Sequence, residues 1–328
     1  MQVAVLDDYH RQMEPQPAWE TLRAHPAIEA IRFFTSPLRG AALFQAVAEA
    51  EIVVALRERT RFTAEVLEGL PRLRFIAQTG NHAAHIDLAA ATRRGVAVGL
   101  WRQGPSGPNS TAELTMGLIL ALVRGIARYH ALLQQGGWTI PYGEVLAGKT
   151  LGVIGLGRVG AEVSRLGRAF GMEVLAWSPH LTPERAQRAG AQAVDLDTLL
   201  QRSHIVTVHV PLQPDTHHLL DAQRLDRLRP GAWVVNTARG PLIDEEALVA
   251  RLRDGRIRGA ALDVFDREPL PPEHPLRHLP NVVLTPHAGW PTDATYAAFA
   301  EAAVRLIEEF LRQDPRHLLN PEVWEDRR

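Results

Sequence analysis

Short runs of β-branched and other apolar residues alternate with amphipathic stretches along most of the chain. In the first hundred residues the apolar runs predict strands at residues 3–6, 29–34, 52–55, 73–79 and 96–98. The stretches between them have helical spacing, clearest at residues 41–51, 63–70 and 86–94. Such alternation is typical of a parallel sheet with helices packed on its faces. We therefore expect an α/β fold.

A second alternating series follows a stretch rich in glycine and proline at residues 101–109, which we interpret as a crossover between domains. A long helix is expected at residues 111–132, with Ser110 as its cap. Six strands are then predicted at residues 151–154, 173–177, 205–209, 232–236, 260–263 and 282–284. Six strands with intervening helices are enough for a doubly wound dinucleotide-binding domain.

One helical pattern, at residues 294–311, is left over after those six strands. We expect it to return to the first domain, which makes that domain discontinuous. The predicted boundaries are 1–101 with 290–328 for the first domain and 102–289 for the dinucleotide-binding domain. The 328 residues are many for a single hydrophobic core, which also favours two domains.

A glycine-rich turn, Gly155-Leu156-Gly157-Arg158-Val159-Gly160, lies between a predicted strand and a predicted helix at 161–170. In this context Gly155 permits a tight turn, Gly157 allows a pyrophosphate to approach the backbone, and Gly160 lets the helix pack closely on the strand. The N-terminus of the helix then offers amide groups to the phosphates. The turn therefore predicts dinucleotide binding, and a purely structural turn is the alternative.

The second strand of such a domain usually ends in an acid that binds the adenosine ribose. Here Ser178 stands at that end, with no carboxylate and with Arg185 as the nearest downstream arginine. Ser178 can bond a ribose hydroxyl but cannot repel a 2′-phosphate as aspartate would. We predict NAD as the cofactor, with NADP possible.

A second phosphate motif is out of context. Residues 143–150, GEVLAGKT, match the P-loop pattern, and Lys149 is the only lysine in the chain. A P-loop follows a strand and opens a helix, whereas this motif leads directly into the strand at 151–154. We interpret it as a turn before that strand, and a P-loop nucleotidase would require ATP binding that depends on Lys149.

Three polar residues follow separate strand predictions near the C-terminus: Arg239, Glu268 and His287. Singly, each has a plain alternative, namely a solvated turn, a local pair with Arg267 and an ordinary loop histidine. Jointly, they follow strands that should end at one edge of the sheet, where open α/β sheets bind ligands. An arginine, a carboxylate and a histidine at that edge can bind an anionic carbonyl compound and pass it a proton.

The composition narrows the functional classes. Net charge is −1, which favours neither nucleic acid nor an anionic membrane surface as a partner. No cysteine occurs, which excludes disulfides, cysteine nucleophiles and thiolate metal sites, and we predict no metal. The first ten residues lack the apolar region of a secretory signal, and the apolar run at 114–123 is too short to span a bilayer. We expect a cytoplasmic protein.

The sequence resembles the D-isomer-specific 2-hydroxyacid dehydrogenase family, which includes phosphoglycerate dehydrogenases and the glyoxylate and hydroxypyruvate reductases. The segments that carry the resemblance are LGVIGLGRVG (151–160), HVPL (209–212), VVNTARGPLIDE (234–245), AALDVFDREPL (260–270), the segment 285–289, NSTAEL (109–114) and, more loosely, 78–88. The resemblance implies two Rossmann-like domains with parallel sheets, a flavodoxin-like substrate-binding (catalytic) domain and a dinucleotide-binding domain, with a cleft between them.

The resemblance also implies an NAD(P)-dependent oxidoreductase that transfers a hydride between nicotinamide C4 and substrate C2. Arg239 would hold the substrate carboxylate and carbonyl oxygen, because its fork makes two parallel bonds to a carboxylate. His287 would act as the acid or base at the substrate oxygen. Glu268 would hydrogen-bond the second ring nitrogen of His287. This bond would fix the tautomer of the imidazole and favour its protonated form.

Further residues match family positions that contact the cofactor or the substrate. The cofactor positions are Gly155, Gly157, Arg158, Val159, Gly160, Ser178, Val210, Pro211, Thr237, Ala238, Asp263 and Gly289. The substrate positions are Arg57, Thr79, Gly80, Asn81, His82 and Arg239. Relatives often have Gly-x-Gly-x-Asp-x-Ile-Asp where this chain has GNHAAHID at 80–87, which bears on the identity of the substrate.

Two further expectations rest on the resemblance. The segments 101–109 and 136–148 match the family's two-fold dimer contact, so we expect a homodimer. The expected ligand is a small 2-ketoacid or 2-hydroxyacid. The alternative function is an NAD(H)-sensing binding protein of the corepressor type, which keeps the same three residues. Formate dehydrogenases fit less well, because they pair their histidine with glutamine rather than with a glutamate.

Overall fold

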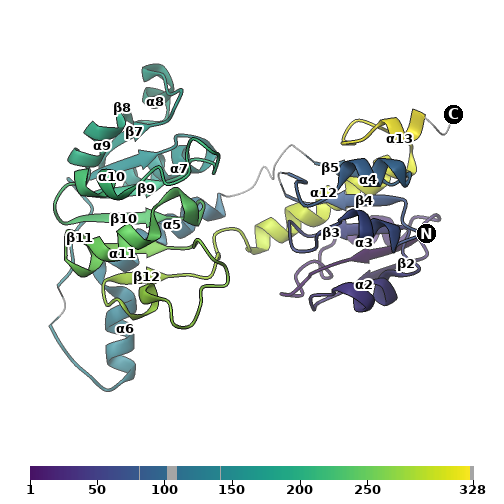
Figure 1. Cartoon of the computed structure of the whole chain (residues 1–328), viewed down its shortest axis with the longest axis horizontal. Coiled ribbons are helices and arrows are strands. Elements are labelled where there is room, and N and C mark those ends of the chain that lie inside the picture. The colour runs from purple at the N-terminus through teal and green to yellow at the C-terminus, as the bar shows by residue number, and fades with distance from the viewer. Residues whose placement is uncertain (81, 102–108, 141, 326–328) are drawn as a thin grey trace. The chain divides into compact units, whose positions relative to one another are not determined.

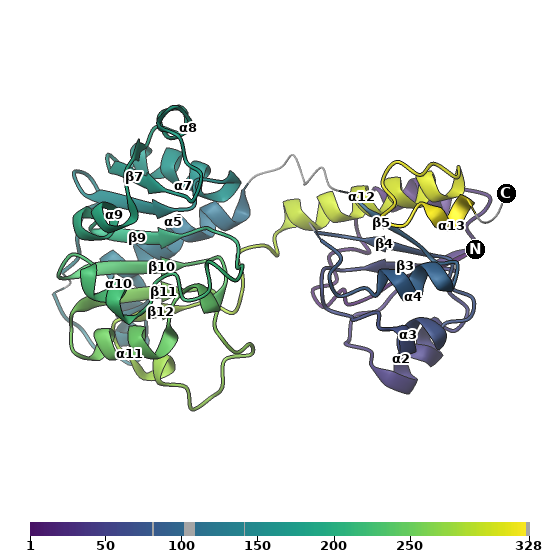
Figure 2. The same ribbon diagram turned by 45° about the horizontal axis from the view of Figure 1, so that its top comes forward.

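The computed structural model of the chain describes residues 1–80, 82–101, 109–140 and 142–325. The chain forms two compact units. The first consists of Met1–Pro108 and Pro291–Arg328, and the second consists of Asn109–Trp290. Figures 1 and 2 show the helices and strands of each unit from two directions.

The first unit contains a five-stranded parallel sheet with the order β2-β1-β3-β4-β5. Its strands are β1 (Gln2–Val5), β2 (Ala30–Phe33), β3 (Ile52–Ala55), β4 (Phe75–Gln78) and β5 (Ala97–Leu100). Its helices are α1 (Trp19–Arg23), α2 (Gly40–Val47), α3 (Ala64–Glu68), α4 (Leu88–Arg93), α12 (Asp293–Leu311) and α13 (Glu322–Glu325). The predicted strands are confirmed. The sequence pattern does not predict α1, a five-residue helix whose N-cap residue Ala18 offers no side-chain cap as a signal.

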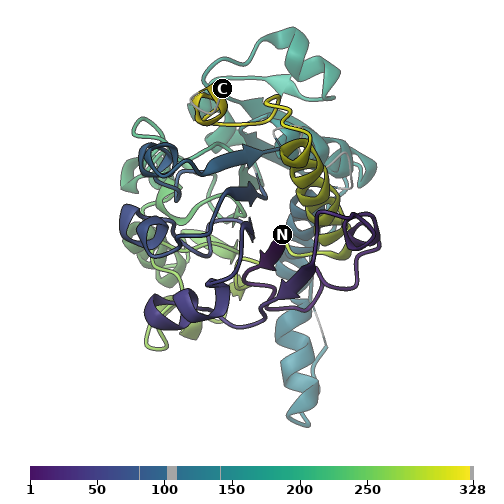
Figure 3. The same cartoon turned by 90° about the vertical axis from the view of Figure 1, so that its right-hand side faces the viewer.

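Helices cover both faces of this sheet. Side chains of α2, α3 and α4 pack on one face, in a core that includes Leu43, Leu67 and Val53. On the other face α12 packs against α1 and β4, and the ring of Phe310 stacks on Phe75 with centroids 4.5 Å apart. Figure 3 shows α12, in yellow-green, beside the strands. A helix from the end of the chain therefore completes the core of the first unit.

A segment after α12 is bonded to the edge of the same sheet. Leu319 N donates to Val98 O (2.8 Å) and Leu100 N donates to His317 O (2.9 Å). Asn320, which is 2% exposed, accepts from Val98 N through Oδ1 (2.8 Å). Its Nδ2 donates to Val96 O at 2.9 Å. One buried amide side chain thus pairs two backbone groups of β5 and its lead-in.

The second unit contains a seven-stranded parallel sheet with the order β12-β11-β10-β9-β6-β7-β8. Its strands are β6 (Thr150–Ile154), β7 (Glu173–Trp177), β8 (Gln192–Ala193), β9 (Ile205–Val208), β10 (Ala232–Asn236), β11 (Ile257–Leu262) and β12 (Val282–Leu284). Its helices are α5 (Ser110–Arg124), α6 (Ile126–Gln134), α7 (Arg158–Ala169), α8 (Pro183–Arg188), α9 (Leu196–Arg202), α10 (Ala222–Arg227), α11 (Glu245–Arg253) and the 3₁₀ helices η1 (Gly240–Leu242) and η2 (Pro275–His278). The prediction of six strands is wrong by one, because β8 is a two-residue edge strand without a recognisable pattern.

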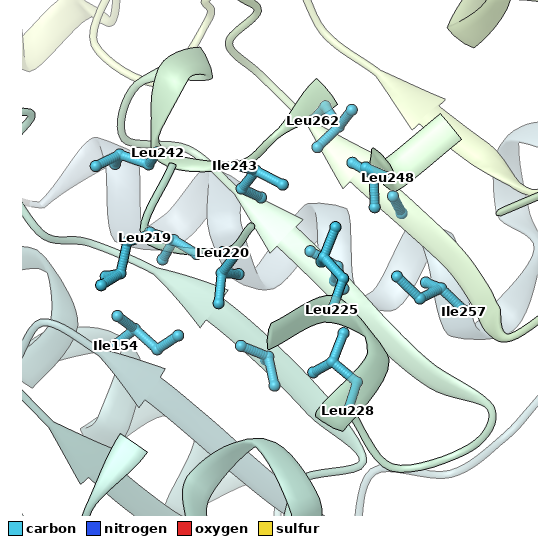
Figure 4. Close-up of a cluster of buried hydrophobic side chains, with 14 of the residues drawn as sticks. Ile154, Leu219, Leu220, Leu225, Leu228, Leu242, Ile243, Leu248, Ile257 and Leu262 are labelled. Atoms are coloured by element: carbon cyan, nitrogen blue, oxygen red, sulfur yellow. The ribbon is translucent and has the colours of Figure 1, made fainter. Parts of the chain in front are cut away.

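Apolar side chains of the central strands point alternately to the two faces of this sheet. Ile154 and Val234 face a core formed with α9, α10 and α11, whereas Val153 and Val235 face one formed with α5 and α7. Figure 4 shows the first of these cores, with residues of several strands and helices converging. Burial on both faces is the reason that these strands read as continuous apolar runs.

The single helix expected at 111–132 is wrong. Helix α5 ends at Arg124, with Gly125 (φ of +63°) as its left-handed C-cap, and α6 continues at an angle of 64°. Asn109, not Ser110, is the N-cap of α5, with Oδ1 accepting from Ala112 N. Glycine adopts positive φ without the steric cost that other residues meet. The break therefore follows from Gly125 itself.

Among the described residues, no single helix combines the length and apolar character needed to cross a bilayer; the bent pair α5 and α6 passes only together, by length and composition. The segment 143–149 is irregular and leads into β6, which confirms its interpretation as a turn before a strand.

We predict that Asn320→Ala destabilises the first unit. The variant leaves the backbone groups of Val98 and Val96 without their partner, and each buried group left unpaired costs about 1–3 kcal/mol. Chemical denaturation followed by circular dichroism should show the loss. Gln45→Ala, on the exposed face of α2, is the control and should stay within about 0.5 kcal/mol of the parent. Equal stability of both variants would contradict the assigned role of Asn320.

Candidate active site

The predicted functional residues of the second unit lie at one edge of its sheet. All its strand pairs are parallel, so the carboxyl ends of the strands share that edge. Arg239, Glu268 and His287 follow β10, β11 and β12, which are neighbours in the sheet. The predicted cofactor positions follow β6, β7, β9, β10, β11 and β12. This is the edge at which open α/β sheets bind their ligands.

The glycine-rich turn packs too tightly for side chains at two positions. Gly155 has φ of +101°, and a Cβ there would lie 2.6 Å from the backbone of His209 and Val210. A Cβ on Gly160 would lie 2.0 Å from the carbonyl oxygen of Gly155. At Gly157 an added Cβ would meet nothing within 4 Å. The turn is therefore closed toward the protein and open on its outer side, as a pyrophosphate requires.

Helix α7 begins inside the motif, at Arg158, rather than after it as predicted. Gly157 is its N-cap, and no side chain caps the helix. The N-terminus of this 12-residue helix, which no side chain caps, presents backbone amide donors and partial positive charge to an anion. Asn109 Nδ2 donates to Arg158 O (3.0 Å), which ties the start of α5 to this turn.

Ser178, at the end of β7, takes part in the turn itself. Its Oγ accepts a hydrogen bond from Leu156 N (2.8 Å). The hydroxyl can still donate its own proton, and it adds no negative charge to the place where an adenosine ribose would lie. The sequence predicts that Ser178 contacts the cofactor, and the structure adds this bond to the glycine turn.

The turn that carries Arg239 is shaped by Asn236, which is 1% exposed and ends β10. Its Oδ1 accepts from Ala238 N (3.0 Å), and its Nδ2 donates to Arg239 O (2.8 Å). Thr237 is buried, with its Oγ1 2.9 Å from Thr115 Oγ1 in α5. Both ends of the turn are thus fixed, whereas the side chain of Arg239 is exposed. Sequence reasoning missed Asn236, although an asparagine closing the apolar run AWVV was the available signal.

The next turn residue, Gly240, brings this turn against the loop that carries Glu268. A Cβ on Gly240 would lie 2.0 Å from the carbonyl carbon of Phe265 and 2.5 Å from Asp266 N. Only glycine permits that approach of two backbones. The positive charge of Arg239 is close enough to lower the pKa of the Glu268 carboxyl.

Glu268 and His287 are joined directly. Glu268 Oε2 lies 2.8 Å from His287 Nδ1, and Oε1 accepts from Phe265 N (3.1 Å). Burial by itself would raise the pKa of Glu268, but the bonds from His287 and Phe265 and the charges of His287 and Arg239 outweigh it, and the pKa lies below its ordinary value. The carboxyl is therefore ionised at neutral pH, and Nδ1–H donates to it. Nε2 is left as the ring atom that can exchange a proton with a substrate.

The loop that carries His287 is held by Asp263, which is 1% exposed. Its Oδ1 accepts from Thr285 Oγ1 and from Ala288 N, and its Oδ2 accepts from Gly289 N (2.9 Å). Burial raises the pKa of the Asp263 carboxyl despite these bonds. His287 itself has φ of +56°, and its amide donates to Asp263 O (2.9 Å). The sequence predicts Asp263 as a cofactor contact, and in the structure this residue fixes the left-handed turn at His287.

Apart from Arg239, which belongs to the second unit, the predicted substrate positions that the structure describes lie in the first unit, after β3 and β4. Arg57 has φ of +58°, and its amide donates to Thr79 Oγ1 (3.0 Å). Gln78 Nε2 donates to Arg57 O (3.2 Å), which ties the two strand ends. A Cβ on Gly80 would lie 3.3 Å from Arg57 Cδ, so the arginine side chain passes over Gly80.

His82 is also part of this group, and its role involves a residue that sequence reasoning missed. Its Nε2 lies 2.8 Å from Glu58 Oε1, and its carbonyl oxygen accepts from Gln78 Nε2 (3.2 Å). Burial would raise the pKa of Glu58, but the charges of Arg57 and His82 hold it below its ordinary value. Asn81 lies outside the described residues. Among the described residues, no group of three or more histidine and acidic side chains has a geometry that suits a metal ion.

Comparison with known proteins agrees with this geometry. Residues 116–289 match the sequence profile of the NAD binding domain of the D-isomer specific 2-hydroxyacid dehydrogenases. The chain belongs to this family. The cofactor of the matched domain is accordingly NAD. The turn between β6 and α7 leaves room for it at Gly157, and the N-terminus of α7 has no side-chain cap.

Individual members of the family cover most of the chain. A glyoxylate reductase of Thermofilum pendens is 39% identical over 80% of this chain and 79% of its own length. A D-3-phosphoglycerate dehydrogenase of Methanocaldococcus jannaschii is 40% identical over 82% of this chain, which spans about half (51%) of that protein's length. The crystal structure of a putative D-3-phosphoglycerate dehydrogenase oxidoreductase from Ralstonia solanacearum superposes with a TM-score of 0.86, at 35% identity and 98% coverage of both chains.

We predict that Glu268→Gln lowers stability at neutral pH more than at acid pH. A carboxyl whose folded pKa is depressed stabilises the fold above its unfolded pKa of about 4.3, and that contribution is lost as the pH falls through the folded pKa. Urea midpoints of parent and variant should therefore differ at pH 7 and converge below about pH 4. Glu273→Gln, at another exposed glutamate of the same loop, is the matched control. A difference that is unchanged across this range would argue against an ionised Glu268.

Proposed function

We propose that the chain is an NAD-dependent D-2-hydroxyacid dehydrogenase that works as a 2-ketoacid reductase. The observation that carries this proposal is the bond between Glu268 and His287, on the same sheet edge as the glycine-rich turn. A carboxylate-backed imidazole beside a dinucleotide turn is equipped for proton transfer coupled to hydride transfer.

Each residue of the triplet has a defined task in this reaction. Bound NADH supplies the hydride that reaches C2 of the ketoacid. Arg239 holds the substrate carboxylate and polarises the carbonyl oxygen through its guanidinium. His287 delivers a proton from Nε2 to that oxygen, and a positioned acid of this kind contributes about 10²–10⁴-fold in rate. Glu268 keeps the proton on Nδ1 and stabilises the imidazolium before transfer.

The remaining site residues support cofactor and substrate. Gly155, Gly157, Gly160 and the first residues of α7, Arg158 and Val159, bind the pyrophosphate. Further cofactor contacts come from Ser178, Val210, Pro211, Thr237, Ala238, Asp263 and Gly289. Arg57, Thr79, Gly80 and His82 contact the substrate, together with Asn81. Ser178 carries no charge to repel a 2′-phosphate, so NADPH is a second possible reductant.

The charge and hydrogen-bonding capacity of these groups indicate the chemical class of the substrate. Arg239 selects a carboxylate beside the carbonyl, which is the defining feature of a 2-ketoacid. His82, a proposed substrate contact, is paired with Glu58, and an imidazole and a carboxylate are groups that hydrogen-bond hydroxyls. Small ketoacids such as glyoxylate, hydroxypyruvate and pyruvate are therefore the substrates to test.

We also propose that the chain works as a homodimer. Helix α6 has no buried residue, and Figure 1 shows it projecting from its unit. Large apolar side chains on α6 and the segment after it are exposed: Ile126, Leu133, Trp138, Ile140, Tyr142 and Val145. A groove of about 870 Å³ between this segment, α5 and the start of β12 lies beside them. An exposed apolar arm next to an apolar groove suits a two-fold contact with a second copy.

The predicted activity is the oxidation of NADH when a 2-ketoacid is added, followed at 340 nm. His287→Ala should lose about 10²–10⁴-fold in kcat because the positioned acid is gone. Its affinity for NADH, measured by quenching of protein fluorescence, should remain within a few-fold of the parent. His278→Ala, an exposed histidine of the same unit, is the control and should keep full activity. Near-normal turnover by His287→Ala would reject the assigned role.

Sedimentation should give the mass of two chains. The double variant Trp138→Ser with Ile140→Ser removes two side chains that are 87% and 91% exposed, and it should shift the chain toward a monomer without lowering its melting temperature. A monomeric parent chain at micromolar concentration would overturn the dimer proposal, whatever the outcome of the activity assay.

A further inference from the structure

The segment that carries Glu268 is an irregular excursion between β11 and η2, and a small set of side chains holds it. Residues 263–274 contain no helix or strand, and Asp266, Arg267 and Glu268 are exposed. Arg277 donates to the carbonyl oxygens of Leu270 and Pro271 (2.6 and 2.8 Å) in the later half of the segment. The half that contains Glu268 depends on a different residue.

That residue is Glu245, the first residue of α11, whose side chain is 15% exposed. Its Oε2 accepts a long hydrogen bond from Asp266 N (3.4 Å), two residues before Glu268. Its Oε1 lies 3.0 Å from Nε2 of His274, at the end of the segment. One carboxylate therefore contacts the segment on both sides of Glu268.

The tautomer of His274 supports this bridge. Its Nδ1 accepts a hydrogen bond from Leu276 N (3.3 Å), so in the neutral ring the proton is on Nε2 and is directed at Glu245. Glu245 thus meets two donors, one at each oxygen. An ionised carboxylate can accept both bonds, whereas a protonated carboxyl must use one oxygen as a donor.

We propose that Glu245 is a positioning residue for the acid–base pair. Its carboxylate anchors the 266–274 segment so that Glu268 meets His287 Nδ1, and protonation of Glu245 releases one of the two anchors. This inference rests on the proposed reductase activity, since it concerns the pair that would carry out proton transfer.

The electrostatic surroundings make this anchor sensitive to pH. Burial raises the pKa of the Glu245 carboxyl, and the neighbouring charge of Asp266 raises it further, against the bonds from Asp266 N and the opposing effect of His274. Asp266 in turn interacts with the charges of His217, His218 and Asp244. Partial burial raises the pKa of the Asp266 carboxyl as well. A group with a raised folded pKa takes up its proton on acidification before an ordinary glutamate does. Mild acid therefore weakens the anchor while Glu268, whose pKa is lowered, is still ionised.

The test compares Glu245→Gln with Glu246→Gln, its exposed neighbour on the same helical turn. Glutamine has one acceptor and one donor, so it mimics the protonated carboxyl. We expect Glu245→Gln to lower kcat for ketoacid reduction by about 10-fold, as a small misplacement of a catalytic group does. KM for the ketoacid and the affinity for NADH should change less than about two-fold, because neither ligand is bound by this residue. Glu246→Gln should behave as the parent.

The pH profile separates positioning from plain structural damage. In the parent, kcat should fall on the acid side with a step that belongs to Glu245, and Glu245→Gln should lack that step. His274→Gln, whose amide can still donate to Glu245, should keep more activity than His274→Ala. An unchanged acid limb in Glu245→Gln, or equal loss in the Glu245 and Glu246 variants, would overturn the proposal.

A second readout does not depend on turnover. In ¹⁵N-histidine NMR spectra, the Nδ1 proton of His287, assigned through its absence in His287→Ala, should exchange faster with water in Glu245→Gln than in the parent. Absence of ketoacid reduction by the parent would reject the proposed function and leave this measurement standing. Identical exchange in both proteins would reject the positioning role alone.

Discussion

The site depends on one hydrogen bond between loops that leave neighbouring strands. Glu268 follows β11 and His287 follows β12, and their side chains meet at 2.8 Å only because the two strands pair in parallel and end at the same edge. The bond gives the imidazole a fixed orientation and a fixed tautomer. It also keeps a charged carboxylate at a half-exposed position, where the charges of His287 and Arg239 favour its ionised form.

The loops around this bond are irregular, so buried polar side chains rather than a ladder of backbone bonds hold them. Asn236 closes the turn that presents Arg239, and Asp263 closes the turn that presents His287. Both side chains are about 1% exposed, and each satisfies backbone groups that would otherwise be unpaired. The same principle operates in the first unit, where Asn320 pairs with the edge of the sheet. Gly240 adds a steric condition, because any side chain would separate the two loops.

The sequence predicts the sheets well because each central strand is buried on both faces and reads as an apolar run. It fails where an element is too short or is redirected locally: β8 has two residues, and Gly125 breaks a helix whose apolar pattern continues beyond it. The placement of Arg239, Glu268 and His287 at one edge of the sheet is predictable because each lies in the loop that follows a strand prediction. The contact of Glu58 with His82, the contacts of Glu245 and the hydrogen bonds of Asp263 to the His287 loop are not predictable. The residues that they join are more than twenty positions apart, and no local sequence pattern indicates such contacts.

The most direct test of the account is a crystal structure of the chain with NAD and oxamate, an unreactive analogue of a 2-ketoacid. We expect His287 Nε2 to lie about 2.6–3.2 Å from the carbonyl oxygen of oxamate, with Glu268 still bonded to Nδ1. We also expect the guanidinium of Arg239 to bind the carboxylate of oxamate and nicotinamide C4 to face its carbonyl carbon. An oxamate bound away from His287, or a histidine turned from Glu268 in that complex, would contradict the proposed role of this pair in proton transfer.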